Sequence, residues 1–137
     1  MTKKTVLFIC THNSSRSQIA EGFLNSLFAS NYKAYSAGLK PSILNPYAFE
    51  VMKEIGIDLS NQSSKSIEKF KEVNFDYVVT VCDNAKETCP FFLGKKIIHK
   101  SFEDPASFKG NIEDTLKFFR KVRDRIKEFI IETFGKN

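Results

Sequence analysis

The feature that most constrains the fold of this chain is a short apolar run near its start. Residues 5–10 (TVLFIC) are β-branched and aromatic, without polar residues at alternate positions. A strand of this kind is buried on both faces, which is typical of the interior of a parallel sheet. The run is too short to span a membrane or to form the apolar core of a signal peptide. We therefore expect a cytoplasmic protein without a membrane partner.

The rest of the chain alternates between helix-like and strand-like segments. The sequence predicts helices over residues 17–29, 46–55 and 112–134, a short helix near 67–72 and a short helix or turn over 83–88. It predicts further strands over residues 33–37, 75–82 and 96–100. This alternation, without a linker or repeat, is typical of one α/β domain over residues 1–137. We expect a three-layer sandwich in which helices flank a four-stranded parallel sheet. Ligands of such sheets bind at the carboxyl ends of the strands.

Composition narrows the range of functions. The 137 residues carry a net charge of +5, and six of the 21 basic residues lie on the predicted C-terminal helix. The chain has no basic and aromatic pattern of a nucleic-acid-binding module, so we expect no nucleic-acid partner. A modest positive field favours small anionic substrates. Three cysteines suit catalytic or buried thiols in a reducing compartment better than a disulfide scaffold.

The segment after the first strand has the composition of an anion-binding loop. Cys10 ends the strand, Arg16 and Ser17 begin the helix, and the loop between them consists of Thr11, His12, Asn13, Ser14 and Ser15. Backbone N–H groups and the helix N-terminus can both face an anion in such a loop. Arg16 can bind two oxygens of a tetrahedral oxyanion, and the same field favours the nucleophilic thiolate of Cys10. We expect Ser17 to donate a hydrogen bond to that sulfur and Asn13 to be left-handed.

Two further strands end in side chains that can react. Cys82 ends the third strand, and Cys89 follows seven residues later. A helical segment would hold their Cα atoms about 10.5 Å apart, whereas a disulfide needs about 7 Å or less, so a bridge requires unwinding. After the fourth strand, Asp104 is better placed than Glu103 to protonate a leaving oxygen. Taken singly, these residues are better explained as a structural cysteine and an ordinary Asp-Pro turn. The cysteine spacing is too wide for a usual zinc site, and we expect no metal ligands.

Together, these motifs resemble those of the thioredoxin-coupled arsenate reductases, which are built on the low-molecular-weight protein tyrosine phosphatase fold. CTHNSSRS resembles the oxyanion loop of that fold, and VTVCDNAKETCP and SFEDPA carry the other two cysteines and the acid. The resemblance extends over essentially all 137 residues.

The resemblance implies that the chain reduces arsenate to arsenite. Cys10 would attack arsenate held by residues 11–16, and Asp104 would protonate the departing oxygen. Cys82 would then attack Cys10 and release arsenite, and Cys89 would attack Cys82. Thioredoxin would reduce the resulting Cys82–Cys89 disulfide. We expect phosphate or sulfate to bind as analogues, no tightly bound cofactor, and a monomer.

Three departures from the family pattern concern the site. His12 stands where many members have glycine, and Ser15 stands where some have a dispensable cysteine. Lys65 stands where some members have an acidic residue of a potassium site, together with the counterparts of Asn13, Glu21 and Ser36. We therefore expect the Lys65 ammonium to lie near Glu21 in place of a potassium ion.

Two alternatives to a reductase are open. A low-molecular-weight phosphatase would use a Cys10 phosphoenzyme and would place aromatic residues just after the acid. Here the acid is followed by Pro105, Ala106 and Ser107, and only Phe108 comes near. A phosphocysteine carrier would use Cys10 to hand a phosphoryl group to a partner and would leave the acid idle.

Overall fold

A four-stranded parallel sheet forms the centre of the protein. The structure, a computed structural model, describes residues 2–82 and 94–135. The strands are β1 (Lys4–Cys10), β2 (Tyr32–Gly38), β3 (Phe75–Thr80) and β4 (Gly94–His99). They are all parallel, in the order β2-β1-β3-β4. The predicted sheet is confirmed, with the first strand in its interior.

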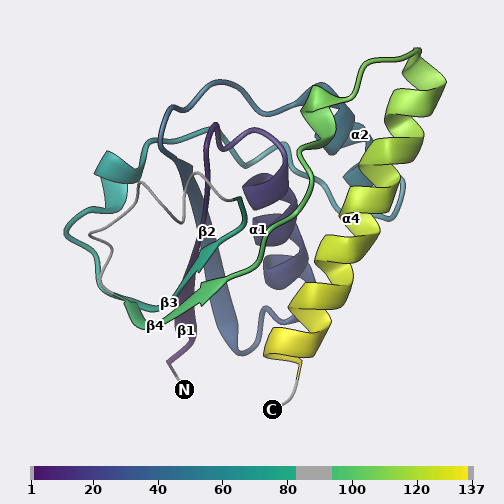
Figure 1. The fold of residues 1–137 in the computed structure, drawn as a ribbon. Coiled ribbons are helices and arrows are strands. Elements are labelled where there is room, and N and C mark those ends of the chain that lie inside the picture. Colours follow the sequence, from purple (N-terminus) through teal and green to yellow (C-terminus); the bar gives the residue numbers. More distant parts are fainter. Residues whose placement is uncertain (1, 83–93, 136–137) are drawn as a thin grey trace.

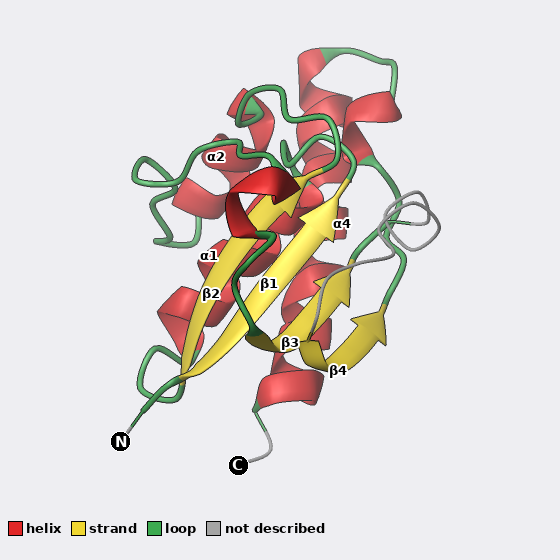
Figure 2. Cartoon of the chain, turned by 90° about the vertical axis from the view of Figure 1, so that its left-hand side faces the viewer, coloured by secondary structure: helices red, strands yellow, loops and turns green. Residues whose placement is uncertain are grey.

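Helices cover the sheet unequally. The helices α1 (Arg16–Leu27), α2 (Pro46–Lys53) and α4 (Ile112–Phe134) lie on one face, and the 3-10 helix η1 (Ile67–Phe70) lies on the other (Figures 1 and 2). Phe134 of α4 packs against Tyr32, with ring centroids 5.0 Å apart. Phe70 of η1 packs against Tyr35 at 5.7 Å. The predicted α/β sandwich is therefore confirmed.

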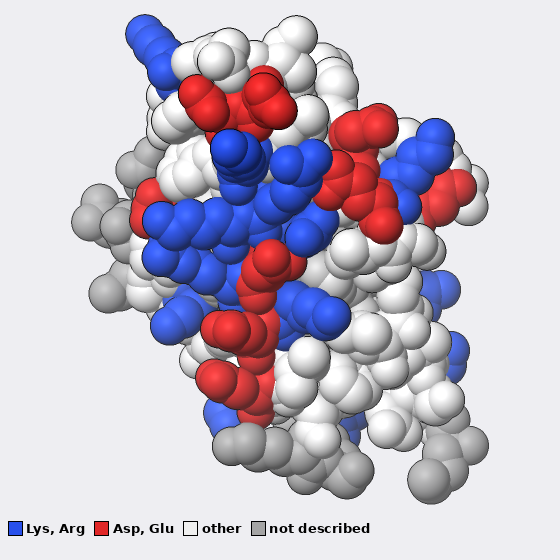
Figure 3. Space-filling view, turned by 90° about the vertical axis from the view of Figure 1, so that its right-hand side faces the viewer, with Lys and Arg blue, Asp and Glu red and all other residues white. Residues whose placement is uncertain are grey.

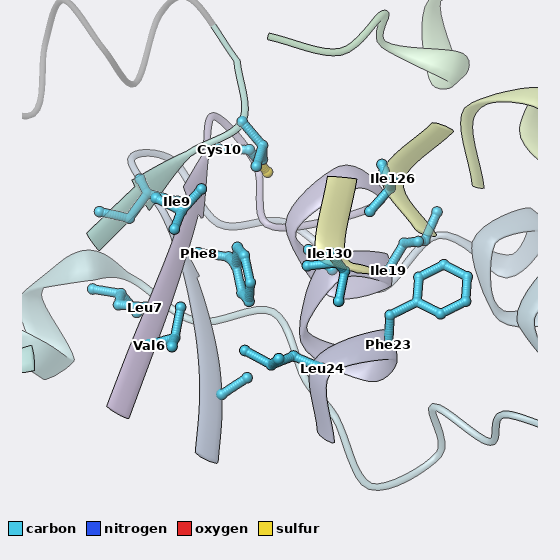
Figure 4. Close-up of a cluster of buried hydrophobic side chains, with 14 of the residues drawn as sticks. Val6, Leu7, Phe8, Ile9, Cys10, Ile19, Phe23, Leu24, Ile126 and Ile130 are labelled. Carbon is cyan, nitrogen blue, oxygen red and sulfur yellow. The ribbon is translucent and has the colours of Figure 1, made fainter. Parts of the chain in front are cut away.

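The interior strand rests on a continuous apolar core. Residues 6–10 are at most 2% exposed. Figure 4 shows Phe8 pointing toward Ile130 of α4, with Phe23 and Leu24 of α1 nearby and Cys10 at the end of the strand. Burying each such side chain contributes about 1.5–3 kcal/mol. The position of Cys10 is thus fixed by the core beneath it.

The predicted elements are confirmed with shifted ends. The predicted start of the first helix moves from residue 17 to 16, and its end from 29 to 27, because Phe28 leaves the helical conformation at φ −131°. β3 ends at Thr80, so Cys82 lies just beyond the strand rather than within it. The helix predicted near 67–72 is a single 3-10 turn. The helix or turn predicted over 83–88, like Cys89, lies outside the described residues.

The outer face of α4 carries much of the positive charge. Figure 3 shows Lys and Arg gathered over this helix, with acidic side chains above and below them. Arg120 binds Glu54 at 2.7 Å and Arg125 binds Glu103 at 3.0 Å. Mixed charges of this kind are typical of a solvated helix face. Among the described residues, no helix has the length and apolar character needed to cross a membrane.

Two glycines serve different purposes. Gly38, at the end of β2, lies against the loop after β1: a Cβ there would come within 2.8 Å of the Asn13 backbone nitrogen and 2.9 Å of the Thr11 carbonyl oxygen. Gly56, after α2, has a φ of +84° and no atom within 4 Å of such a Cβ. Gly38 is therefore needed because a side chain would clash with the loop, and Gly56 is needed because its positive φ disfavours other residues.

We predict that Gly38→Ala displaces the loop after β1 and impairs the site. Overpacking against backbone should cost about 1–3 kcal/mol of unfolding free energy, and misplacing the loop should lower the activity of the site by roughly tenfold or more. Gly56→Ala is the control, because it should cost about 1–2 kcal/mol through its backbone conformation alone. Urea unfolding and an activity assay on both variants test this. Equal loss of activity in both would contradict the prediction.

Candidate active site

The loop after β1 turns its carbonyl groups outward. Figure 1 shows this loop beside the segment that follows β2. N–H groups of residues 39–45 bind the carbonyls of Cys10, Thr11, His12 and Ser14 at 2.8–3.3 Å. Gln18 and Ile19 bind the other two carbonyls, those of Asn13 and Ser15. Within the described part of the chain, no acceptor binds the N–H groups of residues 11–15. The loop can therefore bind an anion through its backbone.

Asn13 holds the loop in this shape. It has a φ of +51° and is fully buried. Its Oδ1 accepts from the Lys65 N–H at 2.8 Å, and its Nδ2 donates to Ser17 Oγ at 2.8 Å. Ser17 Oγ lies 2.9 Å from Cys10 Sγ, so its hydroxyl can donate to a thiolate at this position. The expected left-handed Asn13 and the expected contact between Ser17 and the sulfur are both confirmed.

Arg16 and Asp104 close the site from the side of the sheet edge. Arg16 NH1 donates to the Phe102 carbonyl at 3.3 Å, and NH2 lies 3.7 Å from Asp104 Oδ2. Asp104 Oδ1 accepts from the Ala106 N–H, which fixes the carboxyl at the start of η2 (Pro105–Ser107). Within the described chain, Arg16 Nε and Ser15 Oγ are buried without a hydrogen-bond partner. Buried polar groups are normally satisfied, so these two atoms indicate a polar ligand in the loop.

Two adjoining cavities open at this edge. The first, of about 180 Å³, is lined by Cys10, His12, Ser14, Ser15, Arg16, Ser42, Asp104 and Ala106. The second, of about 300 Å³, is lined by Thr11, His12, Arg16, Cys82, Ser101, Phe102 and Asp104. They share three residues, His12, Arg16 and Asp104. Thr11 Oγ1 lies 3.4 Å from Cys82 Sγ, so the loop of one cysteine contacts the other. The two thiols therefore face neighbouring spaces.

Some residues that lie close to the predicted site in sequence do not take part in it. Glu103 binds Arg125 away from the site, which leaves Asp104 as the acid there. Phe108 packs on Phe118 at 5.3 Å and does not line the Cys10 cavity. Ser42 was not anticipated, because only tertiary pairing of residues 39–45 brings it to the loop.

A partly buried ion pair lies behind the loop. Lys65 Nζ is 3.9 Å from Glu21 Oε1, as the sequence predicted, and Ser36 Oγ donates to the same carboxylate. Burial raises the pKa of Glu21, and the Ser36 hydrogen bond and the Lys65 charge oppose that rise. Burial lowers the pKa of Lys65, and Glu21 opposes the fall. A potassium ion at this position would have to compete with the Lys65 ammonium for Glu21.

Comparisons with known proteins place these features in a family. The family model described as "Low molecular weight phosphotyrosine protein phosphatase" matches residues 5–136. Arsenate reductase from Bacillus subtilis (strain 168) is 44% identical over 134 residues, covering 94% of this chain and 96% of the relative.

Two solved structures extend the similarity to the fold. "An arsenate reductase in the phosphate binding state" superimposes with a TM-score of 0.84 at 35% identity, covering 97% of this chain and 98% of the other. A Corynebacterium glutamicum thioredoxin-dependent arsenate reductase has a TM-score of 0.66 at 27% identity, covering 95% of this chain and 61% of the other.

Ser17→Ala should lower the reactivity of Cys10 in a pH-dependent way. A hydrogen bond to a charged group contributes about 1.5–3 kcal/mol, so its loss should leave less thiolate at pH 6. We expect iodoacetamide to alkylate Cys10 about tenfold more slowly at pH 6, and at nearly the parent rate at high pH. Ser26→Ala, on the exposed side of α1, is the matched control. A parent-like rate at pH 6 would show that Ser17 does not stabilise the thiolate.

Lys65→Asp should make activity depend on potassium. The parent is expected to work equally well with potassium or a bulky organic cation at equal ionic strength, because the ammonium already neutralises Glu21. In Lys65→Asp, two carboxylates would face each other, and potassium should activate the enzyme several-fold. Lys71→Asp, whose side chain is 65% exposed, is the control. The idea fails if the parent itself is activated by potassium.

Proposed function

The chain belongs to the low molecular weight phosphotyrosine protein phosphatase family, and we propose that it is an arsenate reductase that draws electrons from its own thiols. One observation carries this proposal. The oxyanion cavity over Cys10 adjoins a second cavity that holds Cys82. Phosphoryl transfer needs only the first of these cavities, whereas reduction needs a second thiol next to it.

Cys10 and its loop supply the first step. Arsenate would bind to the free N–H groups of the loop and to Arg16, with Ser15 Oγ and Arg16 Nε as further donors. The thiolate of Cys10, supported by Ser17, attacks arsenic, and one oxygen leaves as water after Asp104 gives it a proton. The Arg16 ion pair aims Asp104 at this cavity. The product is a covalent bond between Cys10 sulfur and arsenic(V).

Cys82 supplies the reduction itself. Its thiolate attacks Cys10 Sγ, a sulfur–sulfur bond forms, and the sulfur–arsenic bond breaks. The electron pair of the broken bond stays on arsenic, so arsenic(V) becomes arsenic(III) and leaves as arsenite. The two thiols are oxidised to a Cys10–Cys82 disulfide. The Thr11 hydroxyl beside Cys82 Sγ keeps the attacking sulfur next to the loop.

Cys89 resets the enzyme in this scheme. Its thiolate attacks Cys82, which returns Cys10 to the thiolate form and leaves a Cys82–Cys89 disulfide. We infer that thioredoxin reduces this disulfide, since one structural neighbour is thioredoxin-dependent. Cys89 lies outside the described residues, so its role rests on the resemblance to the family. We also propose that the protein acts as a cytoplasmic monomer.

A weak phosphatase activity is the second candidate function. Cys10, Arg16 and Asp104 share one cavity and meet the needs of phosphoryl transfer. No Phe, Tyr or Trp side chain lines that cavity in the described part of the chain, so an aryl phosphate has no such ring to stack on. The phosphatase reading also leaves both remaining cysteines without a role.

Cys89→Ser should release about one arsenite per enzyme and then stop. The Cys10–Cys82 disulfide would form but could not be transferred, so mass spectrometry of quenched mixtures should detect it. Cys82→Ser should release no arsenite without an added thiol, because no second sulfur can break the bond to arsenic.

Activity on p-nitrophenyl phosphate provides the control for both variants. Any phosphatase activity of the parent should persist in Cys82→Ser and Cys89→Ser and be lost in Cys10→Ser. Asp104→Asn should lower it as well, whereas a phosphocysteine carrier would be indifferent to that change. Turnover of arsenate by Cys89→Ser with thioredoxin at the parent rate would refute the thiol relay and favour the phosphatase.

A further inference from the structure

His12 is the remaining titratable side chain that faces both cavities. It is exposed and shares the wall between the Cys10 space and the Cys82 space with Arg16 and Asp104. Its Nδ1 lies 3.0 Å from the Lys40 carbonyl oxygen. A carbonyl oxygen can only accept, so Nδ1 carries a proton and Nε2 is the atom that gains or loses one. The ring is thus held in place at the mouth of the anion cavity, in one tautomer.

We propose that the His12 imidazole is a pH-dependent anion-binding group, so that tetrahedral oxyanions bind more tightly when this ring is protonated. The inference rests on the proposed function, because it requires the Cys10 loop to bind an oxyanion. It adds a side-chain role to a residue whose backbone belongs to that loop.

The charges around the cavity explain why one more cation matters. Arg16 is the one guanidinium among the described residues that line the Cys10 cavity, and Asp104 lies 3.7 Å from it. The segments packed against His12 add hydroxyl groups, from Ser42 in the cavity wall and from Ser64, which donates to the His12 carbonyl. Lys40 binds the ring through its carbonyl, and its side chain is exposed. An oxyanion therefore shares its permanently cationic partner, Arg16, with an acidic side chain, so a second cation would strengthen its binding.

Protonation of His12 would add a second cation and a further donor at the mouth of the cavity. The imidazolium donates from both nitrogens, so Nε2–H can face the anion while Nδ1–H stays on the Lys40 carbonyl. Histidine is the side chain that changes charge between about pH 5 and 8. A single added charge at an exposed cavity mouth should strengthen anion binding on the order of three- to tenfold.

The test isolates this ring from the other titrating groups. In the full chain carrying Cys10→Ser and Asp104→Asn, sulfate binding is measured by calorimetry at pH 5.5 and 7.5, a range over which sulfate remains a dianion. Sulfate should bind about three- to tenfold more tightly at pH 5.5. Adding His12→Gln should abolish the difference. Adding His99→Gln should preserve it, because the second of the two histidines binds Thr80 Oγ1 within the sheet.

The unsubstituted chain provides an independent measurement. Binding linkage is reciprocal, so sulfate must favour protonation of the group that strengthens its binding. In NMR titrations, sulfate should move the midpoint of the His12 ring signal to higher pH and leave that of His99 unchanged. An unchanged His12 midpoint, or the same pH dependence of binding after His12→Gln, would overturn the inference. Absence of sulfate binding at both pH values would instead overturn the proposed oxyanion loop.

Discussion

The site depends above all on the side chain of Asn13. A left-handed residue costs about 1–2 kcal/mol in backbone energy, and here two hydrogen bonds of the buried amide offset that cost. One bond reaches the Lys65 backbone and the other reaches Ser17. The first ties the loop to a segment more than fifty residues away in sequence, and the second orients the hydroxyl that faces Cys10. A single amide therefore couples the shape of the loop to the charge state of its nucleophile.

The outer hydrogen bonds of the loop extend this constraint. Residues 39–45 take up the carbonyl groups of the loop, much as a neighbouring strand would. Gly38 allows that approach, since any side chain there would strike the loop backbone. Because the loop carbonyls are hydrogen-bonded on the outside of the loop, its N–H groups point inward and are available to bind a ligand. Anion binding is thus a consequence of how the backbone is paired on the opposite side.

The sequence predicted the parts of this arrangement that are local. The strand–loop–helix order from 5 to 29, the start of α2 at residue 46 and the bounds of α4 depend on neighbouring residues, and the structure agrees closely. The choice of Asp104 over Glu103 followed from its position directly before Pro105, and Asp104 is the one of the two that lines the Cys10 cavity.

What the sequence could not supply are contacts between distant segments. Ser42, the carbonyl of Phe102 and the contact between Thr11 and Cys82 arise only when three strand ends meet at one edge. The predicted end of the third strand at residue 82 is also wrong. Cys82 continues the apolar run of β3, but pairing with β4 ends two residues earlier, at Thr80. Periodicity detects burial, and it does not detect where a neighbouring strand ends.

The two cavities suggest how one fold serves two chemistries. Binding and activation of a tetrahedral oxyanion are complete within the loop, Arg16 and Asp104, whether the central atom is phosphorus or arsenic. What distinguishes the outcomes is the next nucleophile. Water attacking phosphorus returns the free thiolate, whereas a thiolate attacking Cys10 sulfur leaves an electron pair on arsenic. A phosphoryl group on Cys10 does not react with a second thiolate in this way, because phosphorus(V) is much harder to reduce than arsenic(V). A cysteine just beyond the adjoining strand is therefore what allows an oxyanion site of the phosphatase type to release arsenite.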